Sequence, residues 1–531
     1  MPGTKDPAAT AAGGSTQLAV LLAAAMFVLV VDTSLMNVSI SAVIPDLHTT
    51  ASGVQSAIAL EALVSAAFIL INSKVGDLIG RKRAYVLGLL AYGVGALAMT
   101  LAQSIVPVII FWAVIGGLGA SLLLPAMQSL IHGNFEGPAQ KRAYALVGAA
   151  AAVAAAVGPL LGGFITTYLS WRVGFALEDV IIVVILLRIK LVKDVAYTGP
   201  REMDLVGAAL SAVGMGGVVL GILVWQEGGD KVIELMAIGA ASLGALVWWL
   251  KRRQRQGRPA LINPDLFRLP HFRLGISSQM LQNIALGGTM IVLPIFLQMT
   301  LGYNAMKTGL ALAPLSLTMF AVAILMGKKA GRWRAANVIL IGFALVTVGI
   351  GCLIPLVPSA AFGWDLVVPL IVAGAGLGML VSQLNNYTLA PIGQDEVSEA
   401  AGVNSASGSF GLSFGLAVAG GVMLAVLSFS FTSQTNASTV IPDAQKAQVS
   451  QTMEQSAEVM SDAKLQELIV QQPPAVEAEI VHINSTARDR SMQAALLVPV
   501  LAALIGLVGA IRMRRLPEIK PNADLTGLDL A

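Results

Sequence analysis

Residues 143–165 read AYALVGAAAAVAAAVGPLLGGFI, a stretch without a charged side chain. As a helix it is long enough to cross the ~30 Å hydrocarbon core of a bilayer. Gly148 and the run GPLLGG at 158–163 carry little side-chain bulk, so another helix can approach closely, and Pro159 lacks a backbone donor, which permits a bend. The stretch predicts a tightly packed membrane helix. Helix packing alone would explain its glycines, so by themselves they indicate no specific function.

Comparable apolar stretches recur along the whole chain. Its 531 residues are 56% hydrophobic and only 12% charged, whereas soluble domains carry about 25% charged residues. The mean hydropathy is +0.78. We therefore expect an all-α membrane protein with fourteen transmembrane helices, near residues 17–40, 53–73, 84–103, 105–130, 143–165, 174–191, 204–225, 232–250, 274–298, 305–327, 336–357, 366–391, 402–430 and 493–512.

The basic residues give this topology an orientation. With the N-terminus inside, 26 of the 33 Lys and Arg residues fall in inner segments, as expected because cytoplasmic loops retain positive charge. The acidic inner loop GQDEVSEAAG at 393–402 is the exception. We expect a multi-pass protein of a bacterial-type plasma (inner) membrane with both termini cytoplasmic and the bilayer as its surroundings.

A faint internal repeat suggests the domain organisation. The loop KVGDLIGRKR at 74–83 is similar to GKKAGRWR at 327–334, and repeated helical bundles are a transporter architecture. We expect two six-helix bundles plus a two-helix insertion. The divisions are a cytoplasmic tail at 1–16, the N-terminal bundle at 17–195, the inserted helices at 196–255, the C-terminal bundle at 256–515 and a second cytoplasmic tail at 516–531.

One long segment, 431–491, is expected to lie outside the membrane. It is rich in Gln, Ser, Glu and Ala, and Pro473-Pro474 divides two helix-like stretches. Val449, Met453 and Met460 follow helical spacing and suggest an apolar stripe. We interpret the segment as a solvated helical cap over the outer mouth; the alternative is a docking site for an extracytoplasmic partner.

In its glycine-rich run and its repeated loops, the chain resembles the Major Facilitator Superfamily, in particular its fourteen-helix drug:H+ antiporter branch of the EmrB/QacA type. The GPLLGG run matches the antiporter motif of that branch, carried by Gly158, Pro159, Gly162 and Gly163. VDTSLMNVSI at 31–40 resembles a first-span element, with Ser41 in place of an expected proline. SWRVGF at 170–175, DLVG at 204–207 and LGYNAMKTGLALAP at 301–314 also match in place. The resemblance implies a proton-coupled efflux transporter.

Two departures from the family pattern remove intramembrane cations. AVIGGLGA at 113–120 has Ala113 where the family's fourth-span motif has arginine, and Gly408-Ser409 replaces an Arg-Gln pair. Asp32 lies about nine residues, or ~13 Å, from the outer end of its span, at a depth similar to that of Ala113. Without its customary partner, a buried carboxyl favours its neutral form, which suits a group that binds and releases a proton.

The proton-coupling candidates have structural alternatives. Asp32 can instead hydrogen-bond Thr33, Asn37 or a neighbouring helix. Glu178 replaces a family asparagine, and together with Asp179 and Glu61 it is a rival or additional proton site, although the last two can simply lie near the interface.

The loop after the second span fits a superfamily signature at Asp77, Gly80, Arg81 and Lys82. Basic residues accumulate in any inner loop, but charge bias does not require Asp77 or Gly80. The resemblance implies a gating role, in which the loop latches the two bundles in one state.

Polar residues within the spans are candidates for substrate contacts, although hydrogen bonds between helices explain them equally well. They are Asn37, Gln128, Gln282, Asn283, Gln383 and Asn386.

The sequence disfavours an enzyme because it has no nucleophile–base pair, phosphate loop or metal set. Cys352 is the only cysteine, and the four histidines lack metal-ligand spacing. We expect no metal, no cofactor and no nucleic-acid partner, with the proton gradient as the energy source. The predicted function is proton-coupled export of amphipathic drugs or antibiotics by alternating access. The alternatives are transport of one specific metabolite or lipid, or a non-transporting membrane scaffold or sensor.

Overall fold

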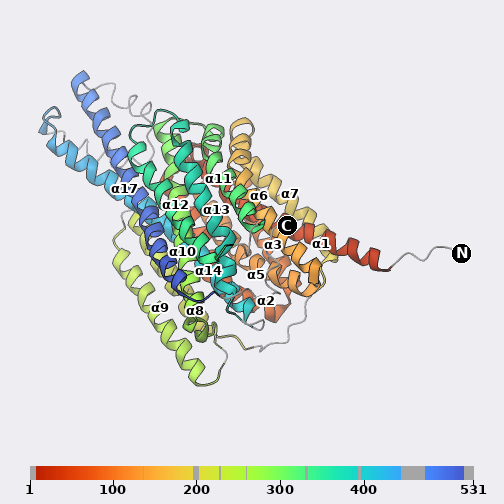
Figure 1. Cartoon of the computed structure of the whole chain (residues 1–531). Helices are drawn as coiled ribbons and strands as arrows, with labels where there is room; N and C mark the ends of the chain where they lie inside the picture. The colour runs from red at the N-terminus through yellow and green to blue at the C-terminus, as the bar shows by residue number, and fades with distance from the viewer. Residues whose placement is uncertain are drawn as a thin grey trace.

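The computed structural model describes residues 7–135, 137–194, 202–226, 229–258, 260–328, 333–392, 396–443, 446 and 473–518. Its regular elements are helices that run roughly side by side in one bundle (Figure 1). We call the end that holds Asp77 and Arg81 the inner end and the opposite end the outer end, following the orientation that the basic residues predict.

The first half contains six membrane-length segments. They are α1 (Pro7–Asp46), α2 (Ala51–Ile79), α3 (Arg81–Leu101), the continuous run α4 (Ile105–Pro107), η1 (Val108–Gly116) and α5 (Gly117–Asn134), then α6 (Gly137–Tyr168) and α7 (Trp171–Leu187), followed by η2 (Ile189–Leu191). Within this half α1 packs on α6, and α3 packs on α5 and α7. At the outer end, Asp46 of α1 pairs with Arg172 and accepts a 2.7 Å bond from Trp171 Nε1.

Two further helices, α8 (Leu205–Gln226) and α9 (Val232–Arg255), lie at the side of the bundle (Figure 1). Asp204 fastens their inner ends: its carboxylate accepts bonds from Gly207 N at 3.0 Å, Trp249 Nε1 at 2.9 Å and Leu261 N at 3.1 Å. Arg253 lies 3.6 Å from the same carboxylate. The predicted DLVG element therefore forms the start of α8, where the buried Asp204 holds α9 and the next loop to that helix.

The second half consists of six more segments with short helices between them. They are η3 (Pro264–Arg268), α10 (Pro270–Ile295), η4 (Phe296–Thr300), α11 (Ala305–Lys328), α12 (Ala335–Leu356), η5 (Gly363–Leu366), α13 (Val367–Leu389), α14 (Val397–Ala437) and α17 (Pro474–Arg515). At the inner end, Glu396 and Glu399 of the acidic loop accept hydrogen bonds from Asn263.

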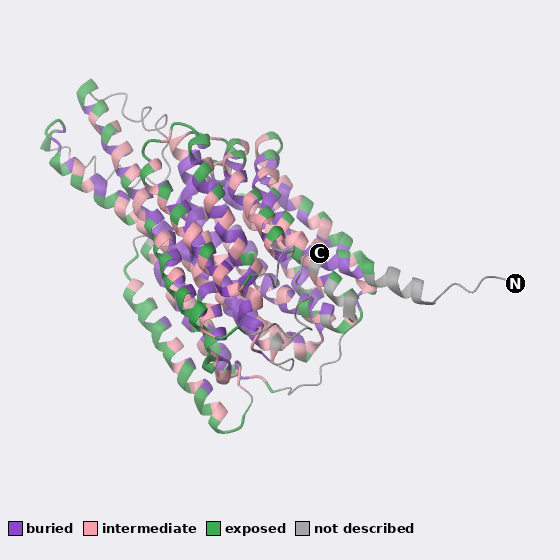
Figure 2. Cartoon of the chain, in the orientation of Figure 1, coloured by how far each residue is buried: buried purple, intermediate pink, exposed green. Residues whose placement is uncertain are grey.

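Within the described residues, thirteen helices are long and apolar enough to cross a membrane. The fourteenth is α7, whose 17 residues reach the lower limit for a span. Many outward-facing apolar side chains are exposed, such as Leu187 at 75% and Val368 at 71%, and exposed residues cover the outside of the bundle while buried ones fill its centre (Figure 2). The predicted all-α fold with fourteen helices is confirmed.

The two halves meet along two seams. In one seam α2 packs against α14, and in the other α6 packs against α11; α1 also contacts α10 and α11. Side chains of both halves contribute to a continuous apolar core, for example Leu35 and Phe175 from the first half and Phe296 and Leu312 from the second. The seams are the surfaces along which any movement of one half against the other must occur.

Helical structure extends into the segment 431–491 from both sides. α14 continues to Ala437 and α17 already begins at Pro474, so both helices extend beyond the apolar runs and project together from the bundle (Figure 1). The reason is mutual packing, because Phe431 of α14 is buried against Ile480 and Ile483 of α17. Hydropathy read along one span cannot detect such pairing. The stripe of Val449, Met453 and Met460 lies outside the described residues.

α1 likewise begins at Pro7, inside the expected tail, although its membrane-competent part starts at Thr16.

Candidate functional site: a buried acid cluster and the contacts between the halves

A carboxyl group is enclosed by three elements of the first half. Asp32 of α1 is 1% exposed. The phenol of Tyr92 on α3 donates a hydrogen bond to Asp32 Oδ2. The indole Nε1 of Trp112 on η1 donates to both carboxylate oxygens, at 3.0 and 3.2 Å. The acid therefore joins α1, α3 and η1 inside the bundle.

Neutral donors from neighbouring helices, and not the family's arginine, bind Asp32. Ala113 is completely buried, as its small side chain allows, but the adjacent Trp112 reaches the acid. Both residues lie in η1, a π-helical stretch. Such stretches carry more residues per turn than an α-helix and shift the side-chain register. Two donors without a positive charge satisfy the carboxyl oxygens but do not neutralise an anion.

A second buried acid lies close to the first. Glu178 of α7 is 2% exposed, and neither of its carboxyl oxygens has a hydrogen-bond partner. It interacts electrostatically with Asp32 and with its neighbour Asp179. A buried carboxylate without donors is costly, so this side chain is suited to carrying a proton.

The remaining two predicted acids are less enclosed. Glu61 of α2 and Asp179 of α7 are both partly exposed. Glu61 interacts electrostatically with Asp32, and Tyr92 is within electrostatic reach of Asp32, Glu61 and Glu178 together. We call these three acids and Tyr92 the acid cluster. Asp179 instead faces Gly93 of α3, where an added methyl group would stand 3.5 Å from Asp179 Oδ1.

The antiporter motif lies where α6 touches both α1 and the second half. A methyl group at Gly158 would stand 2.5 Å from Ser34 Cβ, and one at Gly162 would stand 2.9 Å from Leu35 Cα. On the other side, a methyl group at Gly163 would be 2.6 Å from the carbonyl oxygen of Ala305 on α11. Pro159 lies at the same seam, because a methyl group on Gly309 of α11 would collide with its carbonyl oxygen. The motif's glycines thus permit backbone contact with two helices at once.

The outer end also holds a polar contact between the halves. Gln298 of η4 is 5% exposed; its Oε1 accepts from Ser41 N at 2.8 Å, and its Nε2 donates to Val38 O at 3.0 Å. Nearby, Met306 N of α11 donates to Thr167 Oγ1 of α6 at 2.9 Å. One amide side chain thus binds both a donor and an acceptor of the α1 backbone across the boundary of the two halves.

The predicted gating loop is held mainly by contacts within the first half. Arg81 pairs with Asp77 one helical turn earlier. Lys82 N donates to Asp194 Oδ1 at 3.0 Å. Gly80 adopts a φ of 98° between α2 and α3, a conformation that favours glycine, and it lies against the same Asp194 carboxylate. The ion pair therefore joins two residues of the loop itself, and a latch between the halves stays a prediction.

The predicted substrate-contacting residues are dispersed over α1, α5, α10 and α13. Asn37 Nδ2 donates to Thr33 O and Asn283 Nδ2 to Gln279 O, both at 2.9 Å. These bonds stay within their own helices, which favours a packing role for those two residues. The others comprise Gln282 and Gln383, which are buried, Asn386, which is half-buried, and Gln128, which lines a hollow between α2, α3, α5 and α14.

Three residues of this arrangement were not predicted as site residues: Tyr92, Trp112 and Gln298. Tyr92 and Trp112 are aromatic residues in mid-span with a hydrogen-bonding tip, a combination that needs a polar partner when buried. That signal was available in the sequence, but their proximity to Asp32 depends on helix packing. Gln298 lies at the end of its span, where a polar residue is common and by itself does not indicate a site.

Comparison with known proteins gives a consistent family assignment. The family model described as Major Facilitator Superfamily matches residues 22–416. The multidrug resistance protein Stp of Mycobacterium tuberculosis is 29% identical over 420 residues, which cover 78% of this chain and 77% of that protein. The cephamycin export protein CmcT of Amycolatopsis lactamdurans is 29% identical over 416 residues, covering 76% of this chain and 84% of the relative.

The fold is likewise shared with solved structures. A bacterial homolog of the human lysosomal transporter Spinster, crystallised in an inward-facing and unoccupied conformation, superimposes with a TM-score of 0.59. The alignment covers 96% of this chain and 99% of the other at 12% sequence identity. At that identity the likeness concerns the fold alone.

Proposed function

The chain belongs to the Major Facilitator Superfamily, and on that premise we propose that it is a proton-coupled exporter of amphipathic small molecules. It is a multi-pass membrane transporter of a small-molecule substrate, not an enzyme. The direction of transport is supported by the relatives named for multidrug resistance and for cephamycin export. We place both termini in the cytoplasm of a bacterial-type cell, with the projecting ends of α14 and α17 outside.

The observation that carries the proton-coupling proposal is the uncompensated acid cluster. Asp32 is bound by two neutral donors, and the adjacent Glu178 has no hydrogen-bond partner at either oxygen. Two buried carboxyl groups in electrostatic contact disfavour a state in which both are ionised. At least one proton can thus be held there and exchanged when the surroundings become accessible to water.

A change of protonation would alter helix contacts directly. The Asp32 carboxylate accepts bonds from α3 and from η1, and a proton on it removes the charge that strengthens these bonds. The bonds couple the acid to elements that pack along α2 and α7. We propose that proton binding favours one access state and substrate binding the other, so that inward proton flow drives outward substrate flow.

Transport by purified protein in liposomes tests this proposal. With an imposed pH gradient, we expect a fluorescent amphipathic compound to be moved against its concentration gradient, and a protonophore should abolish the movement. Asp32→Asn should reduce gradient-driven transport to background because the amide cannot exchange a proton. The exposed Asp443→Asn is the matched control and should transport normally. Full gradient-driven transport by Asp32→Asn would reject the role of Asp32.

A narrower function has one supporting observation, since the relative CmcT is named for export of a single antibiotic class. Export of one endogenous compound would appear as transport of few members in a panel of chemically diverse amphipathic compounds. Transport of many unrelated members would favour multidrug export.

A further inference from the structure

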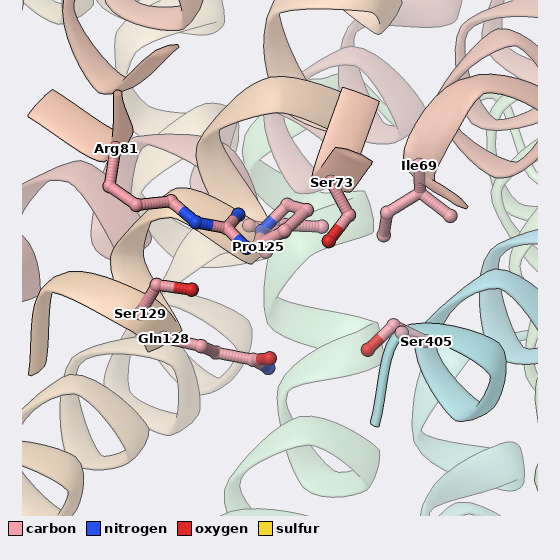
Figure 3. A pocket seen from close by; sticks show the side chains of 9 residues that line it. Ile69, Ser73, Arg81, Pro125, Gln128, Ser129 and Ser405 are labelled. Atoms are coloured by element: carbon pink, nitrogen blue, oxygen red, sulfur yellow. The ribbon is translucent and has the colours of Figure 1, made fainter. Parts of the chain in front are cut away.

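At the inner end, a small open hollow lies between the halves. Its walls come from α2, α3 and α5 of the first half and from α14 of the second. The polar lining consists of Ser73, Arg81, Gln128, Ser129 and Ser405 (Figure 3).

Arg81 is the charged group of this hollow. The residue is 8% exposed, and its side chain extends toward Ser73 and Pro125 in the middle of the lining (Figure 3). Its Nη2 is bonded to Asp77, whereas its buried Nη1 has no hydrogen-bond partner. A buried guanidinium donor without an acceptor is unfavourable. An acceptor atom that enters the hollow would therefore be bound by Arg81 Nη1.

The remaining lining restricts the chemistry of that acceptor. Ser73, Ser129 and Ser405 offer hydroxyl groups, and Gln128 offers an amide, while no carboxylate is among the described residues that line the hollow. Ile69, Leu124 and Pro125 add apolar surface beside these groups. A guanidinium with surrounding hydroxyls suits an oxyanion, and the apolar wall suits the body of an amphipathic molecule.

The position of the hollow favours a transported molecule as the occupant. Gly402 and Ser405 belong to α14, so a ligand bound to Arg81 would contact both halves. The α2–α14 seam is one of the two surfaces along which the halves can move. A ligand there is sensitive to the relative position of the halves, as a substrate must be.

We propose that the Arg81 hollow is an oxyanion subsite at the inner mouth, which binds the carboxylate, sulfonate or phosphate group of an amphipathic anionic substrate. This inference rests on the proposed export function and names a substrate class for it. It also assigns two roles to one motif, because Asp77 holds one side of the guanidinium while the substrate binds the other.

Equilibrium binding of a matched pair of probes tests the subsite. The probes are pyrenebutyrate and its uncharged amide, pyrenebutyramide, which share one aromatic body. The full-length protein is placed in phosphatidylcholine nanodiscs, and the signal of empty nanodiscs is subtracted. We expect the acid to bind roughly tenfold more tightly than the amide, because a charge-assisted bond replaces a neutral one.

The variants separate the subsite from general effects of the loop. Arg81→Gln should weaken binding of the acid roughly tenfold and leave binding of the amide unchanged. Arg83→Gln removes a charge from an exposed position in the same loop and should preserve the preference for the acid. Ser405→Leu leaves Arg81 intact and obstructs the hollow from α14, so it should also weaken binding of the acid. Equal affinity of wild type for both probes, or an unchanged preference in Arg81→Gln and Ser405→Leu, would overturn the proposal.

A second arm distinguishes a substrate from a lipid headgroup, which offers the same phosphate chemistry. Adding phosphatidylglycerol to the nanodiscs should leave the affinity for pyrenebutyrate unchanged. Competition by this lipid in wild type but not in Arg81→Gln would assign the hollow to lipid and overturn the substrate assignment. Binding is measured without a pH gradient and therefore does not depend on proton coupling. If the protein prefers pyrenebutyrate over the amide but shows no proton-driven export, only the export proposal is rejected.

Discussion

Asp32 is held by the hydroxyl group of Tyr92 and the indole of Trp112, from two elements other than its own. Neutral donors orient a carboxyl group without supplying a counter-charge. An arginine would both orient the group and neutralise its charge. The acid is thus oriented without a counter-charge, and a proton still neutralises it. Glu178 beside it has neither donor nor cation, which makes the pair sensitive to a single proton.

Trp112→Phe tests this role of the neutral donors. It deletes the N–H but retains the aromatic ring, and a hydrogen bond to a charged group contributes about 1.5–3 kcal/mol. We expect gradient-driven transport in liposomes to fall at least roughly tenfold, with the melting temperature little changed.

Trp225→Phe is the matched control, because Trp225 lies on α8 with 41% of its surface exposed. It should transport like wild type. Normal transport by Trp112→Phe would show that the indole N–H is dispensable for coupling.

At the scale of helices, the boundary between the halves is made differently at its two ends. At the outer end, the backbones of α6 and α11 touch at Gly163. The side-chain amide of Gln298 on η4 also bonds to the backbone of α1 there. The inner end has the Arg81 hollow. This difference predicts that substitutions at the outer contacts change the balance between access states without unfolding either half.

Gly163→Leu should open the outer end, because even a methyl group there would lie 2.6 Å from Ala305 O. The distance between spin labels at Tyr168 and Trp364, two exposed positions at that end, should lengthen in a Cys352→Ser background. Gly148→Leu lies on the same helix, and a methyl group at that position meets no atom within 4 Å, so its distance distribution should match wild type. Identical distributions for the two leucine variants would refute this account of the seam.

Gln298→Leu should shift the same distance distribution toward the open state. It removes two hydrogen bonds between the halves at nearly constant volume, a loss of about 2 kcal/mol or a population change of more than tenfold. Gln493→Leu removes an amide bond to Ile354 O within the second half and should leave the distribution unchanged. A shift of equal size in both variants would mean that general destabilisation is responsible.

For the whole molecule, the sequence predicted the helices well because each apolar run must satisfy its own backbone in lipid. It could not reveal which distant segments contact one another. The extensions of α14 and α17 depend on Phe431 meeting Ile480 and Ile483, and the donors of Asp32 come from residues 60 and 80 positions away. The acids themselves could be chosen from composition, because an ionisable residue inside a span is rare and costly; their mutual proximity could not.

The measurement that tests the central claim most directly is proton movement during substrate exit, recorded without an imposed gradient. Liposomes containing the purified transporter, a pH-sensitive dye and a transported amphipathic compound are diluted into compound-free buffer of the same pH. For proton antiport, the lumen should acidify as the compound leaves, and liposomes with Asp32→Asn should show no such change. Exit of the compound through the wild-type protein at constant luminal pH would contradict proton-coupled export.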